Sequence, residues 1–498
     1  MDASASTSSA LSPTPAEVVE MNTVSRFLVD AETQTRFEIS EERVLANTHN
    51  YLELEVPIHR LPLEILTRIF VINCAGVRLM PMPDVFSISQ VCRRWREILL
   101  STALFWSDFR VSGTGYDLER KEGQAELAPT VRLFLERSKN HPLTLVFLVL
   151  SEDFRREEYK IPEHLSLLVE SAERWKDVRV YVEDFVHPIF GLLLSSSSGR
   201  TRLSSLQSLG LTGDKYHDIP QPFDIFEHCE SLISVRLDTL SSQWLSLRLP
   251  WKQLTTLHVS HIDSSTQVLL LLRECPRLRS LTLGACDFYS IPPLTSPTII
   301  TLSNLESLSM PNCNHVSVLV GHVTLPRLST LRVQDAKFDP VVPVPEQGGA
   351  FVEFLRRSAC TITHLAFWLP ESESVRVEDI VSFLRLFPFL RTFELEALYP
   401  CGPWNAYDNI MEIDIGIVLT ALASAALPRL GELRIDARWE HVFERLCDAV
   451  LDDQLVALLR GLIIWIETLE PATELDLESL RRLWEVGVRV DMVYNDIY

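Results

Sequence analysis

Few residues of this 498-residue chain have types and spacings that could support chemistry. His441 and Cys447 lie in one segment and could pair as a base and a thiolate nucleophile. His258, His261 and Cys275 come nearest to a metal-binding group. A lone Cys–His pair is a weak signal, and these histidines do not complete a zinc pattern. We therefore expect neither a nucleophilic site nor a metal site.

Two carboxylate pairs are the remaining catalytic candidates. Glu152-Asp153 and Glu157-Glu158 lie among Arg155, Arg156 and Lys160, which is typical of a solvated surface. The sequence also lacks the GxSxG, GxxxxGK[ST], HExxH and GxGxxG motifs that mark nucleophile, phosphate, zinc and dinucleotide sites. The chain is therefore expected not to be an enzyme and to need no cofactor.

Charge and composition limit the classes of partner. The chain carries 46 basic and 67 acidic residues, a net charge of -21, and 46% of its residues are hydrophobic. Nucleic-acid binding needs clustered Lys and Arg, and the sequence has no such cluster. We therefore expect a folded protein that does not bind nucleic acid.

Cysteines and apolar runs indicate the compartment. The 9 cysteines are scattered without CxxC spacing, as in reduced intracellular proteins. The longest apolar runs, at 145–150, 268–272 and 462–466, fall far short of the roughly 20 residues that span a bilayer. We expect no membrane contact and a cytoplasmic or nuclear location.

The N-terminal part divides into three segments. Residues 1–17 are rich in Ser, Ala, Thr and Pro and predict a disordered tail, and residues 18–56 predict a helical lead-in. Residues 57–110 form a dense helical block, in which Pro62 suits the first turn of a helix. Apolar residues then recur at helical spacing on two stripes: Ile65, Leu66, Ile69 and Phe70, and Val91, Cys92, Trp95, Ile98 and Leu99.

A repeated unit dominates the chain from Trp175 onward. The unit is apolar-x-x-apolar-x-apolar, and its copies begin 22 to 40 residues apart. Such a period predicts a solenoid in which each unit contributes one short strand. The ten copies are Trp175-Val178-Val180, Leu206-Leu209-Leu211, Leu232-Val235-Leu237, Leu254-Leu257-Val259, Leu278-Leu281-Leu283, Leu305-Leu308-Met310, Leu328-Leu331-Val333, Ile362-Leu365-Phe367, Leu390-Phe393-Leu395 and Leu430-Leu433-Ile435.

Flanking residues support this interpretation. Pro precedes four of the units, at Pro276, Pro326, Pro388 and Pro428, where it ends a helix and starts an extended segment. Cysteines near the units are expected to be buried thiols. Residues 111–174 predict a linker with a helix at 129–138 and a strand at 143–149.

The C-terminal end is expected to close the repeat region of residues 175–498. The segment Glu440 to Leu469 is predicted to be helical, and Leu477 to Tyr498 a final helix and strand. The predicted fold class is α/β, with a small helical domain followed by an irregular leucine-rich-repeat solenoid.

The helical block resembles an F-box. The segment 58–70, IHRLPLEILTRIF, resembles the opening of that domain, the segment 89–96, SQVCRRWR, resembles its "VC+xW+" signature, and Leu104-Phe105-Trp106 resembles its "LW" element. The segment 73–83 is longer and richer in Pro than in the shortest F-boxes. The later segment 134–143 resembles the "LxRSxxxPL" stretch that follows the F-box in mushroom-type fungal F-box proteins.

The resemblance implies a substrate receptor of a cullin-type ubiquitin ligase. F-boxes dock on a Skp-type adaptor, which links them to a cullin scaffold, and partner proteins carry out ubiquitin transfer. The resemblance therefore implies that the F-box binds the adaptor and that the repeats bind the protein to be ubiquitinated. The residues expected to form or support the adaptor interface are Leu61, Pro62, Leu63, Ile65, Leu66, Val91, Cys92 and Trp95.

The repeat register predicts a partner-binding face. If the repeated apolar residues point inward, the residues between them face outward on each strand. The candidates on that face are Arg236, His258, Arg332, His364, Trp368 and Arg434. Trp368 is favoured as an anchor because large aromatic residues dominate interfaces, although it could instead pack under the loop 399–410 that contains Trp404.

A second class of function stays open. The chain could be a leucine-rich-repeat scaffold that uses its F-box-like block in an assembly without ubiquitin. Co-purification with a Skp-type adaptor and a cullin would separate the two. The sequence alone does not identify the substrate.

Overall fold

A computed structural model describes most of the chain after residue 56. The described residues are 57–74, 83–113, 121–149, 163–182, 188–195, 203–213, 224–238, 247–262, 264–286, 288, 299–313, 315–335, 349–367, 377–395, 415–425, 427–436, 446–447, 453–468 and 474–494. The predicted tail 1–17 and lead-in 18–56 lie outside them. The chain divides into two compact units, Met1–Ile69 and Phe70–Tyr498.

The first unit contains little described structure. A 3-10 helix, η1 (Pro57–Arg60), precedes α3 (Leu63–Cys74), whose later residues belong to the second unit. Pro62 stands just before α3, and its carbonyl accepts the backbone N–H of Leu66 at 3.1 Å. Proline suits this place because the first helical N–H groups need no partner within the helix.

Three more helical elements follow in the second unit. They are α4 (Pro83–Val91), α5 (Arg93–Ser101) and the 3-10 helix η2 (Ala103–Trp106). Cys92 separates α4 from α5 with an extended backbone, and Thr102 ends α5 in the same way. The predicted helical block is therefore present.

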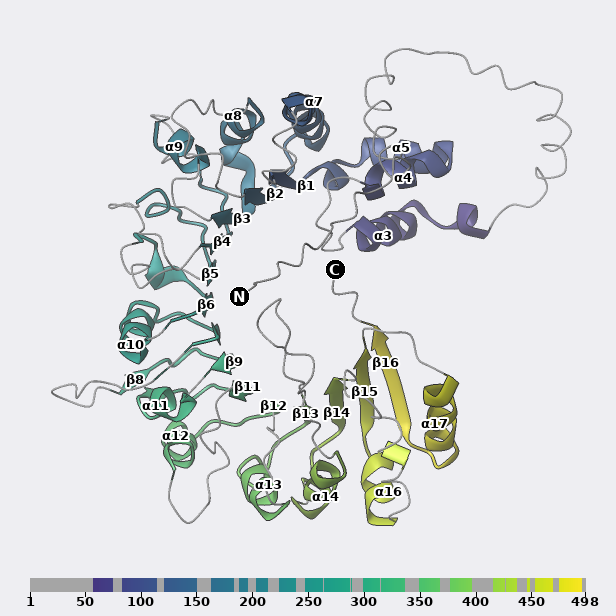
Figure 1. Ribbon diagram of the computed structural model, residues 1–498, viewed down its shortest axis with the longest axis vertical. Helices are drawn as coiled ribbons and strands as arrows, with labels where there is room; N and C mark the ends of the chain where they lie inside the picture. Colours follow the sequence, from purple (N-terminus) through teal and green to yellow (C-terminus); the bar gives the residue numbers. More distant parts are fainter. Residues whose placement is uncertain are drawn as a thin grey trace, which may run out of the picture. The chain divides into compact units, whose positions relative to one another are not determined.

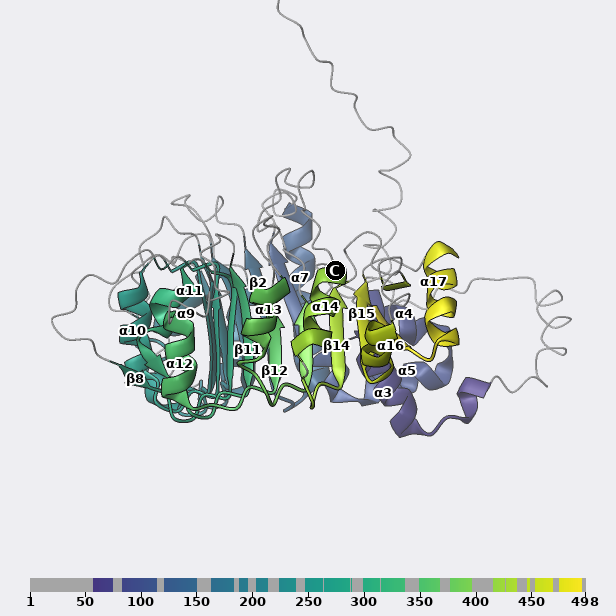
Figure 2. The ribbon, with the colours of Figure 1, turned by 90° about the horizontal axis from the view of Figure 1, so that it is seen from below.

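A parallel sheet of 14 strands makes up most of the second unit (Figures 1 and 2). The strands lie in chain order, and each pairs in parallel with its neighbours. They are β1 (Asp108–Gly113), β2 (Leu143–Val149), β3 (Trp175–Val182), β4 (Ser208–Thr212), β5 (Ser234–Asp238), β6 (Thr256–Ser260), β7 (Ser280–Gly284), β9 (Ser307–Cys313), β11 (Thr330–Asp335), β12 (His364–Phe367), β13 (Thr392–Leu395), β14 (Glu432–Asp436), β15 (Ile463–Thr468) and β16 (Arg489–Tyr494). A separate pair joins β8 (Ile300–Thr301) and β10 (Val323–Thr324).

The repeated unit sets the register of this sheet. All ten predicted copies lie at strands, and their second apolar positions pair in one row from Val178 to Leu433. These side chains are buried: Leu281 is 2% exposed and Leu331 is 0% exposed. Alternate residues therefore face away from the core, as the pleat requires.

Helices cover one side of the sheet and leave the other side to the strands (Figure 1). The described helices of the second unit that follow the helical block are α7 (Lys121–Ser138), α8 (Glu163–Glu170), η4 (Ala172–Arg174), α9 (Pro188–Ser195), η7 (Trp251–Gln253), α10 (Ser265–Glu274), α11 (Val316–Val320), α12 (Ala350–Ser358), α13 (Val377–Leu384), α14 (Ile415–Ala425), α16 (Asp453–Arg460) and α17 (Glu474–Glu485). We call the strand side the open face.

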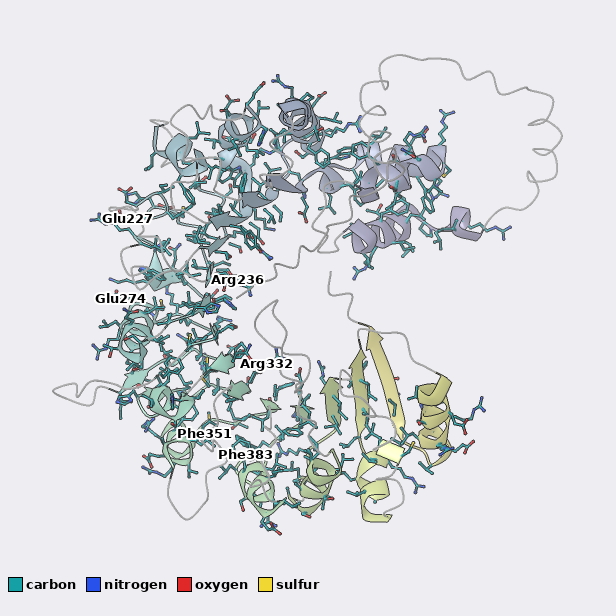
Figure 3. All side chains as sticks on the ribbon, viewed as in Figure 1. Glu227, Arg236, Glu274, Arg332, Phe351 and Phe383 are labelled. Atoms are coloured by element: carbon teal, nitrogen blue, oxygen red, sulfur yellow. The ribbon has the colours of Figure 1, made fainter. Side chains whose placement is uncertain are left out.

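One hydrophobic core lies between the sheet and these helices. It runs through the sheet from Val131 to Val490. Aromatic rings fill it where α12 and α13 meet, with Phe351 and Phe383 centred 5.9 Å apart (Figure 3). Each repeat thus buries its apolar residues mainly against its two neighbours, as in proteins built from stacked repeats.

The segment 134–143 joins the helical block to the sheet. Trp106 contacts Phe134 edge-on at 5.0 Å, and the guanidinium of Arg137 lies 4.4 Å from the Trp106 ring centroid. Ser138 accepts a 2.6 Å hydrogen bond from Arg174, which ends η4 just before β3. These contacts give Phe134, Arg137 and Ser138 packing roles.

Three boundaries differ from the predictions. The helix predicted at 129–138 begins earlier, at Lys121, and contains Pro129. The sheet begins with β1 and β2, before the predicted repeats. The segment predicted to be helical at 440–469 contains α16, but Ile463–Thr468 is strand β15, which pairs with β14.

Candidate functional site

Large apolar side chains are exposed in both units along the helical block. On the α3 residues of the first unit, Leu63 is 53% exposed and Ile65 is 47% exposed. Within the second unit, Ile72, Val91 and Leu100 are also exposed. Large apolar side chains kept in water at this density indicate a surface that a partner covers.

The adaptor residues predicted from the sequence fall into two groups. Exposed or half-buried side chains belong to Leu61, Pro62, Leu63, Ile65, Val91, Cys92 and Trp95. Leu66 is 0% exposed, so it can support the helix but cannot touch a partner.

Aromatic packing in the second unit shows which residues hold the block together. Phe70 contacts Trp95 edge-on at 4.8 Å and lies 6.4 Å from Phe105. Trp106 is 1% exposed, and its indole N–H donates a 2.7 Å hydrogen bond to the Leu99 carbonyl. Trp95 is therefore chiefly a packing residue, with one ring face engaged by Phe70.

The open face of the sheet forms a second candidate surface. Its central row consists of register-paired residues whose side chains alternate with the buried ones. Figure 3 places Arg236 and Arg332 on this face, whereas Glu227 and Glu274 lie on the helix side. From β3 to β16 the row reads Arg179, Gly210, Arg236, His258, Thr282, Ser309, Arg332, Ala366, Glu394, Arg434, Trp465 and Asp491.

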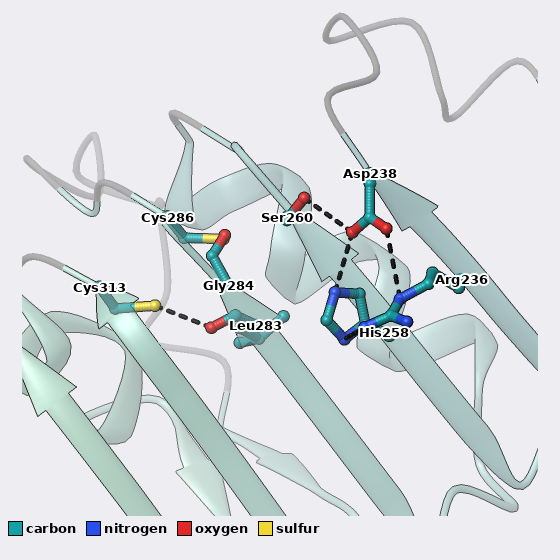
Figure 4. A network of polar contacts seen from close by, with 8 residues as sticks. All are labelled: Arg236, Asp238, His258, Ser260, Leu283, Gly284, Cys286 and Cys313. Carbon is teal, nitrogen blue, oxygen red and sulfur yellow. Dashed lines mark hydrogen bonds and ion pairs between the residues drawn. The ribbon is translucent and has the colours of Figure 1, made fainter. Parts of the chain in front are cut away.

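A polar network on β5 and β6 surrounds Asp238 (Figure 4). One carboxylate oxygen of Asp238 lies 2.8 Å from His258 Nε2 and accepts a 2.9 Å hydrogen bond from the Ser260 hydroxyl. The other lies 3.2 Å from Arg236 Nε. Burial disfavours the Asp238 carboxylate, but the bonds from His258 and Ser260 and the nearby positive charges outweigh it and lower its pKa.

Further along the face, arginines also pair with carboxylates. Arg332 on β11 reaches across β12 to Glu394 on β13 at 3.0 Å, and Arg434 lies 3.6 Å from Glu432 on its own strand. The predicted cations Arg236, Arg332 and Arg434 therefore all lie on the open face, each beside an acidic group. A partner would meet paired charges there rather than a continuous basic surface.

Trp465 is a residue of this face that the sequence reasoning missed. It pairs in register with Arg434, and the buried Trp465 Nε1 and Arg434 Nε atoms both lack a hydrogen-bond partner. Two unmatched donors on adjacent strands could donate to a ligand's carbonyl or carboxylate oxygen. The signal was weak because Trp465 lies in the segment predicted to be helical.

The last two predicted residues of the face have different outcomes. His364 is exposed on β12, and its ring Nδ1 lies 2.9 Å from the Thr363 hydroxyl. Trp368 lies outside the described residues, as does the loop 399–410. The anchor role of Trp368 therefore stays a prediction.

The candidates for covalent or metal chemistry do not form a site within the described part of the chain. Cys229 and Cys275 are buried, and burial raises the pKa of each thiol to about 12, which keeps it protonated. Cys447 donates to the Ser479 carbonyl at 3.4 Å, while His441 lies outside the described residues. No group of His, Cys, Asp and Glu that could hold a metal occurs among the described residues.

Comparison with known families assigns the helical block. Residues 58–112 match the F-box-like family model. The block is an F-box-like domain. This match includes the segments 58–70, 89–96 and 104–106, which resemble an F-box. The exposed apolar residues Leu63, Ile65, Ile72, Val91 and Leu100 also lie within the matched range.

Similarity to a solved structure is low in sequence identity. A solved chain titled "Crystal structure of Rad7 and Elc1 complex in yeast" matches with 14% identity and a TM-score of 0.29, covering 86% of this chain and 94% of that chain. No curated protein sequence matches the chain. None of the described helices is long and apolar enough to cross a bilayer.

Proposed function

We propose that this protein is a substrate receptor of an SCF-type ubiquitin ligase. The observation that carries the proposal is the F-box-like match at 58–112, with apolar side chains left in water on its helices. F-box domains bind Skp-type adaptors, so the exposed Leu63, Ile65 and Val91 are the proposed adaptor contacts. The adaptor would link the chain to a cullin scaffold in the cytoplasm or nucleus.

We further propose that the parallel sheet is a leucine-rich-repeat solenoid whose open face binds the substrate. Ten in-register units and the one-sided helix layer support this interpretation. Arg236, His258, Arg332, His364 and Arg434, together with Trp368, remain the proposed contacts, and Trp465 joins them. Aromatic and Arg residues supply most of the binding energy in protein interfaces.

In this proposal the chain has no catalytic residue. Its contribution would be proximity, because holding a substrate near a ubiquitin-loaded enzyme makes the transfer effectively intramolecular. The domains are proposed as an F-box at 57–110, a joining segment at 111–174 and the repeats with their cap at 175–498. A scaffold role without ubiquitin would share the adaptor contact but not the cullin.

Adaptor binding can be tested with paired substitutions on α3. We expect Leu63→Ala with Ile65→Ala to weaken capture of a purified Skp-type adaptor by about tenfold or more, because two buried apolar contacts are lost. Glu64→Ala with Arg68→Ala, on exposed positions of the same helix, is the matched control. The measurement is adaptor capture by the immobilised chain, read with its melting temperature.

Adaptor capture by these variants tests directly whether Leu63 and Ile65 contact the adaptor. Full adaptor capture by the Leu63/Ile65 variant, at an unchanged melting temperature, would contradict the proposed interface. Equal losses in the variant and in the control would also count against these two residues.

A further inference from the structure

The turns that lead into the strands form a surface that the proposed function does not use. In four repeats a Pro stands at the second position of a turn closed by a backbone hydrogen bond, for example from Leu278 N–H to the Cys275 carbonyl and from Leu328 N–H to the Leu325 carbonyl. Proline is suited to this position because its φ is already set. A buried or half-buried Leu closes each turn, so the residue between the Pro and this Leu is held at the tip.

Arginine occupies three of the four tips. Arg277 precedes β7, Arg327 precedes β11 and Arg429 precedes β14, and all three are exposed. Arg279 and Arg391 are also exposed, one residue before β7 and β13. We call these five residues the basic edge; Figure 2 shows the described turns along the lower border of the sheet.

The basic edge has few counter-charges. Among the described residues, the acids beside it are the exposed Glu274 and Glu306 and the half-buried Glu432, whose backbone N–H donates to the Arg391 carbonyl. Among the described residues none forms a hydrogen bond or ion pair with the side chains of Arg277, Arg279 or Arg327, in contrast to the paired arginines of the open face. The whole chain is strongly acidic, with a net charge of -21, so this edge is where an anionic partner can approach.

The spacing of the tips fits an extended chain. Arg277 and Arg327 are separated by two strand intervals, β7 to β9 to β11, which is about 10 Å. The next tips, Arg327 and Phe389, are again two intervals apart, β11 to β12 to β13, and Arg391 lies two residues after Phe389. An extended peptide in the polyproline II conformation advances about 9 Å in three residues and keeps every third side chain on one side, so acidic side chains at every third position would meet Arg277, Arg327 and then Arg391.

Phe389 adds an apolar contact at the fourth tip. Its ring is 41% exposed, and the Arg429 guanidinium stacks over it at 4.7 Å. A stacked guanidinium keeps its outward N–H groups available for a carboxylate. Glu306 lies between Arg277 and Arg327, which disfavours the closely spaced phosphates of a nucleic acid.

We propose that the basic edge binds an extended acidic segment of a partner protein, with carboxylates at about every third residue. This surface is separate from the F-box-like domain and from the open face. The inference therefore does not depend on the ligase role.

A peptide-binding assay on the full 498-residue chain tests it. The probe is a fluorescein-labelled peptide with Glu at every third position, and its partner probe carries Gln at those positions. We expect the Glu peptide to bind more tightly than the Gln peptide, and the binding to weaken with added salt. Arg277→Ala with Arg327→Ala should weaken it by about three- to tenfold, as expected for two lost surface charge contacts.

Matched variants complete the experiment. Arg481→Ala with Arg482→Ala removes the same charge from exposed positions on α17 and should leave binding unchanged. Arg277→Lys with Arg327→Lys should retain most of it, and Arg391→Ala with Arg429→Ala should weaken it independently. Equal affinity for the Glu and Gln peptides, or equal loss in the α17 control, would overturn the proposal, as would tighter binding of a single-stranded RNA of the same length.

Discussion

At the residue scale, His164 is a buried titratable group whose charge state affects the stability of the fold. It lies in α8, is 5% exposed, and its Nδ1 atom has no hydrogen-bond partner. Burial lowers its pKa from the ordinary 6.5 to about 4, so the folded protein holds the neutral ring. Protonation is then possible mainly in the unfolded chain at mildly acidic pH.

The sign of the pH dependence follows from this pKa. Above pH 6.5 both states are neutral at His164, and the stability is fully present. As the pH falls from 6.5 towards about 4, only the unfolded state gains a proton, so stability is lost. At pH 5 we expect His164 to account for a loss of about 2 kcal/mol relative to neutral pH.

Melting curves at neutral pH and at pH 5 measure this effect. His164→Leu should lose less stability on acidification than the wild type, because the buried ring is gone. His228→Leu, at an exposed position, should lose as much as the wild type. If the three proteins lose stability equally, the burial of a neutral His164 does not govern the pH response.

Aromatic residues show where residue-scale prediction ends. Trp106 could be assigned to packing from its motif, and it is buried. Trp465 was overlooked because Leu462 to Ile466 is a continuous apolar run, which fits a helix or a buried strand equally well. Only its pairing with β14 places it on the open face.

At the scale of elements, arginines connect successive repeats through helix ends. The Arg357 side chain on α12 donates to the Val320 and Val323 carbonyls of the preceding repeat, at 2.8 and 2.7 Å. Val320 ends α11, where carbonyls lack helical partners, and Val323 lies in the short strand β10, so Arg357 satisfies one helix-end carbonyl and one strand carbonyl. The neighbouring Arg356 pairs only with exposed Glu353 on its own helix, in the hydrogen bonds that the structure describes.

These adjacent arginines provide a matched comparison. Arg357→Ala should destabilise the protein by about 1–3 kcal/mol, because it leaves carbonyl groups without a donor. Arg356→Ala should leave stability nearly unchanged, as is usual for an exposed ion pair. A thermal melt that gives equal shifts for both would contradict the inter-repeat role of Arg357.

Strands and helices could be predicted best where residues of one type have a single structural role. The apolar-x-x-apolar-x-apolar unit specifies both burial and register, so all ten predicted units lie at strands of one sheet. Pro129 misled the start of α7, because proline ends many helices and yet lies within this one. Strands β15 and β16 have Gly461 and Gly487 at the first position of the unit, so their pairing with adjacent strands defines them.

At the scale of the whole molecule, the charges are distributed unevenly over the surface. The open face pairs its cations with Asp238, Glu394 and Glu432, whereas the arginines of the basic edge have few acidic neighbours. Composition alone predicted only that the chain is acidic, because a net charge does not show where the charges lie on the surface. The Pro-Arg turns were visible in the sequence, but their alignment on one edge needed the strand order.

The central claim is that the F-box-like domain recruits a Skp-type adaptor and, through it, a cullin. Affinity purification of the tagged chain from cells, with mass spectrometry of the recovered proteins, tests this most directly. We predict that both the adaptor and a cullin are recovered, and that the Leu63→Ala, Ile65→Ala variant loses both together. Recovery of neither partner with the wild type would contradict the account, and recovery of the adaptor without any cullin would contradict the ligase role in favour of a scaffold.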